Sequence, residues 1–180
     1  GFDIEFAELA KEAGCAGMEI GSDSGRDHIL KRLRKGFTTD DIRNLHDICK
    51  TTGVKDCHTF ILGTEDETLE DVERSIEFIV DLDPYGAIVM VWVDDYEALD
   101  PALRKQRLAF RETIEARLTE LKDDFPYWII PPLGVNFSSS MFRRMRRGGF
   151  HGPLWQYFRL GEEQGSNHPG SPARAGELTD

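Results

Sequence analysis

The sequence predicts an α/β fold in which parallel strands alternate with helices, as a partial (β/α) barrel followed by a helical C-terminal segment. Short apolar runs alternate with longer segments whose apolar residues recur at helical spacing. Two of the runs lead into small polar residues, at 19–25 and again at 60–68. In a parallel sheet such strand ends share one edge, where helix amino termini converge and ligands bind. We therefore expect the functional site at that edge.

Apolar periodicity and helix-ending glycines define the first expected elements. A helix is expected over about 3–13, because apolar residues recur at helical spacing and Gly14 follows, a residue that tolerates the left-handed conformation after a helix end. A strand over about 16–21 comes next. The two helices after that strand are expected to end at Gly36 and Gly53.

Three helices are expected to begin at capping boxes, in which a Ser or Thr and an acidic residue three positions later satisfy the first backbone amides. The pairs are Ser24 with Asp27, Thr38 with Asp41, and Thr68 with Asp71. A strand over 57–62 precedes the third box. The helix that begins there has the clearest period of 3.6 residues, carried by Leu69, Val72, Ile76, Ile79 and Val80.

The second half begins with an apolar run over 87–93, which predicts a third strand covered on both faces. Asp-Pro at 100–101 then opens a long helix expected to reach about 122. A short strand over 127–130 and a short helix over 139–147 follow. Three strands make an incomplete barrel with unpaired edges, which natural domains usually pair or cover. The chain is therefore expected to be the latter part of a larger barrel.

The expected organisation is a half barrel over 1–96, a helical extension over 97–160 and a disordered tail over 161–180. The tail is rich in Gly, Ser, Pro and Glu and has no apolar periodicity. The chain has no initiating Met and begins inside an amphipathic pattern. Residue 1 is therefore not expected to be the start of the natural protein.

Composition limits the partners. The 180 residues carry a net charge of −11, which disfavours a general nucleic-acid or anionic-membrane surface. No secretory signal and no apolar run near eighteen residues is present, so a cytoplasmic location is expected. Four arginines at 143–147 lie among aromatic residues. In an acidic chain we expect them to form a solvated helix face or to dock on the acidic rim, while the aromatic residues anchor the C-terminal segment.

Cysteine and histidine residues give no recognisable metal spacing. Cys15, Cys49 and Cys57 are unpaired by any C-x-x-C spacing. Cys57 and His58, taken with Cys49 and His46, lack the spacing of a structural zinc site. We expect Cys49 to pack as a small apolar residue on its helix.

The two strand-to-helix turns resemble those of a known family. Glu-Ile-Gly-Ser-Asp-Ser-Gly at 19–25, with the helix at 29–36, is similar to the fourth strand and Gly-x-Glu-Ser-Gly turn of radical S-adenosylmethionine (SAM) enzymes, especially those that carry a cobalamin-binding domain ahead of the radical domain. Asp23 stands where that family usually has Glu. The stretch 60–68 resembles the fifth-strand signature, commonly Gly-x-Pro-Gly-Glu-Thr, although Glu65-Asp66 replaces its Pro-Gly. The resemblance covers roughly residues 5–95.

The resemblance implies a barrel that binds SAM on a 4Fe-4S cluster and cleaves it reductively to a 5′-deoxyadenosyl radical. It also implies a small-molecule substrate, a reductant such as flavodoxin or ferredoxin and, in the cobalamin-dependent methyltransferase type, cobalamin. The residues expected to bind the cofactor are Gly21, Asp23, Ser24, Leu62, Gly63 and Trp92. The structural alternatives are Ser24 as a helix cap, Asp23 as a solvated carboxylate, Gly63 as a tight turn and Trp92 as a core residue. Glu67 is expected to order its turn by accepting backbone hydrogen bonds rather than to take part in catalysis.

The family's CxxxCxxC cluster loop does not occur in this chain. The expectation is that the loop lies upstream, together with any cobalamin domain. The alternative is a non-catalytic nucleoside-binding or scaffold module derived from a (β/α) barrel. An ordinary phosphate-binding (β/α) enzyme is a third class, but the chain lacks a glycine-rich phosphate loop.

Overall fold

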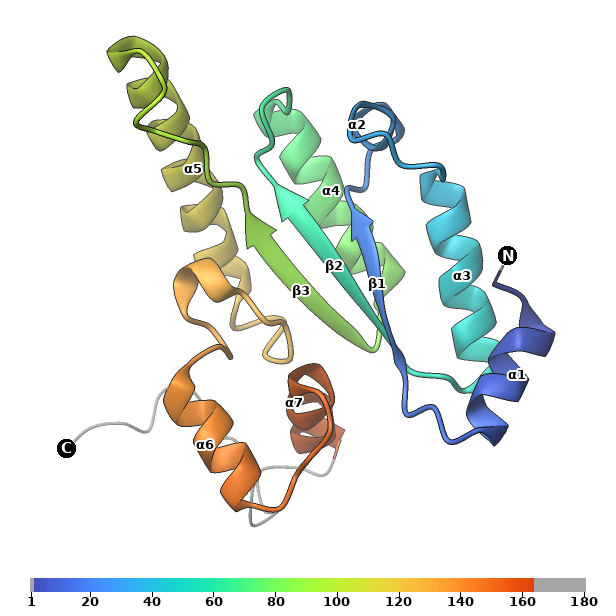
Figure 1. Ribbon diagram of the computed structural model, residues 1–180. Helices are drawn as coiled ribbons and strands as arrows, with labels where there is room; N and C mark the ends of the chain where they lie inside the picture. The colour runs from blue at the N-terminus through green and yellow to red at the C-terminus, as the bar shows by residue number, and fades with distance from the viewer. Residues whose placement is uncertain (1, 164–180) are drawn as a thin grey trace.

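The computed structural model describes residues 2–163 and has a three-stranded parallel sheet at its centre (Figure 1). The strands are β1 (Met18–Asp23), β2 (Asp56–Leu62) and β3 (Gly86–Val91), in the spatial order β1-β2-β3. Both neighbouring pairs are parallel. The predicted α/β class and parallel strands are confirmed.

Helices alternate with the strands and then continue alone. They are α1 (Ile4–Glu12), α2 (Asp27–Arg32), α3 (Thr39–Thr52), α4 (Leu69–Leu82), α5 (Pro101–Leu121), the 3-10 turn η1 (Pro131–Leu133), α6 (Ser139–Arg147) and α7 (Leu154–Glu163). Helix α6 has the predicted bounds, and α5 ends within a residue of the prediction. Helix α7 is absent from the sequence-based prediction. Within the described residues no helix is long and apolar enough to cross a bilayer.

Two of the three predicted capping boxes are confirmed. Thr38 with Asp41 begins α3, and Thr68 with Asp71 begins α4. The third prediction, a box of Ser24 with Asp27, is wrong, because α2 begins after Arg26 without a side-chain cap. Helix α2 also ends at Arg32, well before the predicted stop at residue 36.

One face of the sheet packs on helices α3 and α4. Phe60 of β2 lies on that face, with its ring edge-to-face at 6.2 Å from Phe78 of α4. Leu69 and Val80, predicted as part of the apolar stripe of α4, are exposed instead. Because side chains alternate between the two faces of a strand, the residues next to these buried ones point to the opposite face of the sheet.

The opposite face, here called the open face, remains partly accessible. Cross-strand neighbours in a parallel sheet share a face, so the register groups its residues. The half-buried or exposed positions are Gly21 of β1, Thr59 and Ile61 of β2, and Ile88 and Met90 of β3. The prediction that the third strand is covered on both faces is therefore wrong for this face. Helix α7 covers the amino end of this face, where Trp155 contacts Glu19.

The C-terminal helices share the hydrophobic core of the sheet. Ile114 and Leu118 of α5 and Trp155 of α7 are buried in the same cluster as β2 and β3. Trp155 lies at the amino end of the open face, where its indole Nε1–H donates to Glu19 Oε1 at 2.8 Å. Figure 1 shows α7 near the ends from which the strands start, with α6 beside α7 on the side away from β1. This packing joins the C-terminal segment to the half barrel.

The segment after α5 covers the outer edge of β3. The strand predicted over 127–130 is reduced to single bridges, from Ile129 to Ile88 and from Ile130 to Val135. The four arginines of α6 are exposed, whereas Trp155, Tyr157 and Phe158 are buried. The predicted solvated face and aromatic anchor are both present, although Phe142 stays exposed. Of the expected tail, 161–163 belongs to α7 and 164–180 lies outside the described residues.

Candidate functional site at the carboxyl edge of the sheet

The end of β1 is irregular at the residues predicted to bind the cofactor. The pairing with β2 shifts between Gly21 and Asp23, which leaves Ser22 as the extra residue of a bulge. Asp23 has a φ of 59°, a left-handed conformation that Asp tolerates better than most side chains. Its buried carboxylate forms an ion pair with Lys35, which follows α2. The bulge thus places one carboxylate, already paired with an ammonium group, at the carboxyl edge.

Ser24 faces the helical layer. Its fully buried hydroxyl lies 3.3 Å from Ser75 Oγ of α4 and accepts from Arg26 N–H at 3.2 Å. The neighbouring Gly25 lies so close to α4 that a Cβ there would meet the Cβ of Phe78 at 2.6 Å. The Ser-Gly of this turn therefore joins β1 to α4. Of the first motif, Glu19 and Gly21 lie on the open face, and Asp23 Oδ1 lies 4.0 Å from the position that a Cβ at Gly21 would take.

The end of β2 lies against β3 and α5. The side chain of Leu62 is fully buried, and its carbonyl accepts the Trp92 N–H at 2.8 Å. Gly63 has a φ of +83°, and a Cβ there would meet Ile114 Cδ1 at 2.6 Å. Both findings show why this turn carries glycine, since the backbone approaches α5 closely. Trp92, immediately after β3, is 41% exposed, so it is not an ordinary core residue.

Arg107 of α5 connects two of these strand ends, a role that the sequence does not reveal. Its Nη2 donates to the Gly63 carbonyl at 2.5 Å and its Nε to Asp94 Oδ2 at 2.7 Å. Asp94 also accepts from the Trp92 indole Nε1–H at 3.1 Å. The carboxyl ends of β2 and β3 are thereby held together by one guanidinium group.

Glu67 has the structural role predicted for it. Its Oε2 accepts from the Thr64 N–H at 2.7 Å and from the Thr64 hydroxyl at 3.1 Å. Burial raises the pKa of this carboxyl, and the hydrogen bonds from Thr64 only partly offset the effect. The side chain closes the turn before α4, as expected of a structural group.

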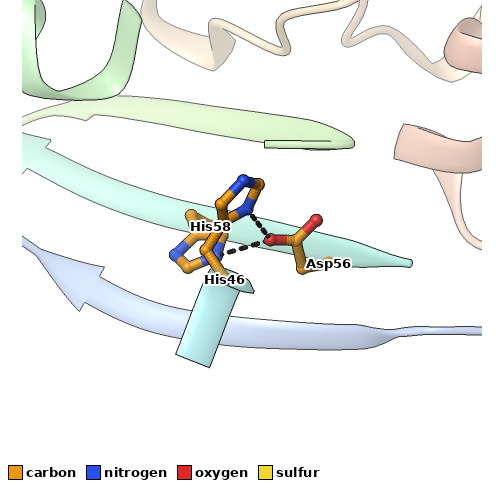
Figure 2. Close-up of side chains that lie close together, drawn as sticks. All are labelled: His46, Asp56 and His58. Atoms are coloured by element: carbon orange, nitrogen blue, oxygen red, sulfur yellow. Dashed lines mark hydrogen bonds and ion pairs between the residues drawn. The ribbon is translucent and has the colours of Figure 1, made fainter. Parts of the chain in front are cut away.

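A second polar cluster lies near the amino end of β2, between the sheet and α3. Figure 2 shows His46 of α3 and His58 of β2 converging on Asp56. Asp56 Oδ2 lies 2.6 Å from His46 Nδ1 and 3.0 Å from His58 Nε2. Burial acts to raise the pKa of Asp56, but hydrogen bonds from both imidazoles and from the Tyr85 N–H prevail and lower it. The sequence singled out both histidines without their partner Asp56.

The cysteines do not form an iron–sulfur site. Cys49 and Cys57 are buried, and burial raises the pKa of the Cys49 thiol to about 12. In residues 2–163 the one group of three potential metal ligands is His46, Asp56 and His58, and it contains no cysteine. Thiols of this kind do not fit the three thiolates of a 4Fe-4S cluster. Cys49 instead packs as the small apolar residue that was expected.

Comparison with protein-family models indicates the same family as the two strand-to-helix turns. Residues 1–79 match the family model described as the Radical SAM superfamily. The predicted resemblance is confirmed. The matched region contains β1, β2 and both strand-to-helix turns, including Asp23 and Gly63.

Two curated proteins are similar over nearly half of the chain. A tryptophan 2-C-methyltransferase from Streptomyces laurentii is 35% identical over 88 residues, which cover 46% of this chain and 15% of that protein. An uncharacterized methyltransferase from Pyrococcus horikoshii is 34% identical over 82 residues, covering 46% of this chain and 18% of that protein. Nearly half of the chain is thus similar to segments of larger methyltransferases.

Two solved structures of the radical SAM methyltransferase TsrM from Kitasatospora setae are also similar. One holds cobalamin and a 4Fe-4S cluster, and its match covers 51% of this chain and 17% of the TsrM chain. The other holds tryptophan and the SAM analogue aza-SAM, and its match covers 50% of this chain and 18% of the TsrM chain. Both are 28% identical to this chain, with a TM-score of 0.46. The chain spans less than a fifth of the length of each of these three proteins.

Proposed function

We propose that this chain is the SAM-binding part of a radical SAM enzyme of the methyltransferase type. The match of residues 1–79 to the radical SAM family model is the observation that carries the proposal. Two methyltransferases among the sequence relatives support the reaction type. The parallel strands support it as well, since they bring both family turns to one edge of the sheet.

The proposed contacts lie where β1 ends beside the open face. At Gly21 an added Cβ would meet nothing closer than 4.0 Å, so a ligand can approach the backbone there. The Asp23 carboxylate binds the Lys35 ammonium and has the charge to accept a hydrogen bond from a ligand ammonium or ribose hydroxyl. Trp92 offers an exposed ring at the same edge for contact with adenine.

Leu62, Gly63 and Ser24 are proposed to act through their backbone or through packing. The Leu62 and Gly63 carbonyls are engaged by Trp92 and Arg107, and both residues pack tightly. In this proposal they hold the backbone of the turn after β2 in a fixed position next to the ligand. The Ser24 hydroxyl holds the β1 turn against α4.

The proposed cofactors are SAM, a 4Fe-4S cluster and, from the resemblance of the turns, cobalamin. When bound, these groups supply reductive SAM cleavage and methyl transfer. Because the described cysteines do not converge, the cluster ligands are proposed to come from outside this chain. A small-molecule substrate, a reductant such as flavodoxin or ferredoxin, and a cytoplasmic location complete the proposal.

The second candidate is a nucleoside-binding or scaffold module without radical chemistry. One observation favours it: the described residues contain the two family turns and no group of three thiolates. The two functions differ in whether the complete protein carries a cluster. Anaerobic iron–sulfide reconstitution of the complete protein distinguishes them. A brown chromophore and reductant-dependent 5′-deoxyadenosine are expected; their absence with SAM binding retained supports the module.

Binding itself is tested on the 180-residue chain with SAM as the titrant, by NMR line shifts or equilibrium dialysis. Gly21→Ala adds one methyl group in open space and is expected to leave the fold intact while weakening SAM binding at least about fivefold. Asp23→Asn is expected to weaken it as well, because a charge-assisted hydrogen bond contributes about 1.5–3 kcal/mol. Gly148→Ala at the end of α6 is the matched control. Unchanged affinity in both test variants would refute the assigned contacts.

A further inference from the structure

The cluster of His46, Asp56 and His58 has the geometry of a metal site (Figure 2). His46 is presented by α3, and Asp56 and His58 are presented by β2. One nitrogen of each ring and one carboxylate oxygen lie within 4.8 Å of one another. All three residues are buried, so the three atoms converge in a region largely shielded from water.

The remaining polar atoms of two of these side chains are already held by other groups. His58 Nδ1 lies 2.7 Å from the hydroxyl of Ser22, the bulge residue of β1. Asp56 Oδ1 accepts the Tyr85 N–H at 3.0 Å. Metal-binding imidazoles and carboxylates characteristically have such outer partners, which fix the tautomer and orient the ligand atom. Here the outer partners direct His58 Nε2 and Asp56 Oδ2 toward the same point.

The charge of the cluster requires a cation. Within residues 2–163 the ion pairs of Asp56 involve the two histidines and no Lys or Arg. The adjacent Lys55 donates instead to the Tyr85 hydroxyl at 2.9 Å. A buried carboxylate without a cationic partner is costly, so a proton on an imidazole or a bound metal ion must balance it.

We propose that His46, Asp56 and His58 bind one divalent transition-metal ion of the zinc class. Two imidazole nitrogens and one carboxylate oxygen suit Zn²⁺ or Co²⁺, with water as the fourth ligand. Metal–ligand bonds of about 2.1 Å at tetrahedral angles separate neighbouring ligand atoms by about 3.4 Å. The two nitrogen–oxygen separations, 2.6 and 3.0 Å, would therefore open by less than about 1 Å each.

The proposed ion joins α3 to β2 on the helix-covered face of the sheet. Asp56 and His58 begin β2, whereas the proposed SAM contacts lie at the opposite ends of the strands. The proposed metal site therefore lies apart from the proposed SAM contacts. Its ligands include none of the three cysteines, which separates it from any iron–sulfur chemistry.

The test is a titration of the metal-free 180-residue chain with CoCl₂ under anaerobic conditions, followed by displacement with Zn²⁺. We expect one equivalent of Co²⁺, with visible d–d bands of four- or five-coordinate geometry and no thiolate charge-transfer band. Bound Zn²⁺ is expected to raise the thermal midpoint. His46→Gln keeps a side-chain donor for Asp56 and is expected to lose Co²⁺ binding at least about 100-fold, while His151→Gln, which removes an exposed imidazole, binds as wild type.

Three results would overturn the proposal. The first is the absence of stoichiometric Co²⁺ binding by the wild-type chain. The cluster would then be a hydrogen-bond network in which a proton on an imidazole balances the charge of Asp56. The second is a thiolate charge-transfer band, which would assign the metal to cysteines. The third is unchanged binding in folded His46→Gln. If far-UV circular dichroism shows that His46→Gln is unfolded, the Co²⁺ titration is repeated with His58→Gln, and unchanged binding there, or the wild-type result described above, overturns the proposal.

Discussion

Arg107 donates a hydrogen bond of 2.5 Å to the carbonyl oxygen of Gly63, 44 positions earlier in the chain. The same guanidinium group pairs with Asp94 and lies over the ring of Phe110 with 5.2 Å between Cζ and the ring centre. One side chain of α5 thus holds the loops that follow β2 and β3. The C-terminal segment thereby helps to shape the edge where the family turns meet.

Replacing Arg107 should loosen that edge. Arg107→Ala is expected to lower the free energy of unfolding by about 3 kcal/mol, because it leaves the largely buried Asp94 without its cation. Amide exchange in the turn 63–67 should accelerate more than exchange in α4. Arg111→Ala, which breaks a half-exposed pair with Glu115 inside α5, is the control. An equal exchange response in both variants would contradict the role of Arg107.

Glu67 should make stability depend on pH. Its pKa lies above the ordinary value of 4.5, so above pH 4.5 the unfolded chain releases a proton that the folded chain retains. Stability from this group therefore falls as the pH rises from 4.5 through the folded pKa. Urea denaturation should show wild type losing stability relative to Glu67→Gln over this range. Glu65→Gln, which removes an exposed carboxylate from the same turn, controls for net charge, and parallel curves for wild type and Glu67→Gln would refute the assignment.

Gly25 should tolerate no side chain. Gly25→Ala is expected to destabilise the protein by about 1–3 kcal/mol, because the new Cβ would meet Phe78 Cβ at 2.6 Å and the Ser75 backbone at 2.9 Å. Gly36→Ala is the control, since nothing lies within 4 Å of a Cβ at that position. Thermal unfolding measures both. A stable Gly25→Ala would mean that the glycine of the first motif is not needed for packing on α4.

Trp155 should anchor the C-terminal segment to the sheet. Trp155→Ala is expected to cost about 3–5 kcal/mol, the usual loss for a large buried aromatic residue. Trp155→Phe retains most of the contact and loses the hydrogen bond to Glu19, so about 1–2 kcal/mol is expected. Denaturant unfolding followed by near-UV circular dichroism tests both. If the C-terminal segment of Trp155→Ala unfolds in a separate transition at lower denaturant than the sheet, that segment folds as an independent unit and Trp155 is not needed to join the two.

The sequence predicts the alternation of strands and helices well, because this information is local. The Thr-x-x-Asp boxes at 38–41 and 68–71 satisfy amides within a single turn, and both occur as predicted. The same pattern at Ser24 failed for a tertiary reason. Its hydroxyl lies beside Ser75, 51 positions away, and such a contact leaves no trace in the local pattern.

The candidate site was predictable only in its location. Parallel strand order places 21–23 and 62–63 at one edge, which the topology confirms. The partners of these residues could not be inferred, because Lys35 and Arg107 reach Asp23 and Gly63 from other elements. The pairing of His46 with His58 through Asp56 was missed for the same reason. Helix α7 escaped prediction because residues 154–158 are all buried, so its sequence shows no single apolar face.

Strand β1 pairs with β2 along one side, and among residues 2–163 its other side has no strand partner. The unpaired edge of a sheet can serve as a template on which another extended segment adds as a strand. Sedimentation at several loading concentrations should therefore accompany every affinity or unfolding measurement, so that association between copies is not mistaken for ligand binding or intrinsic stability.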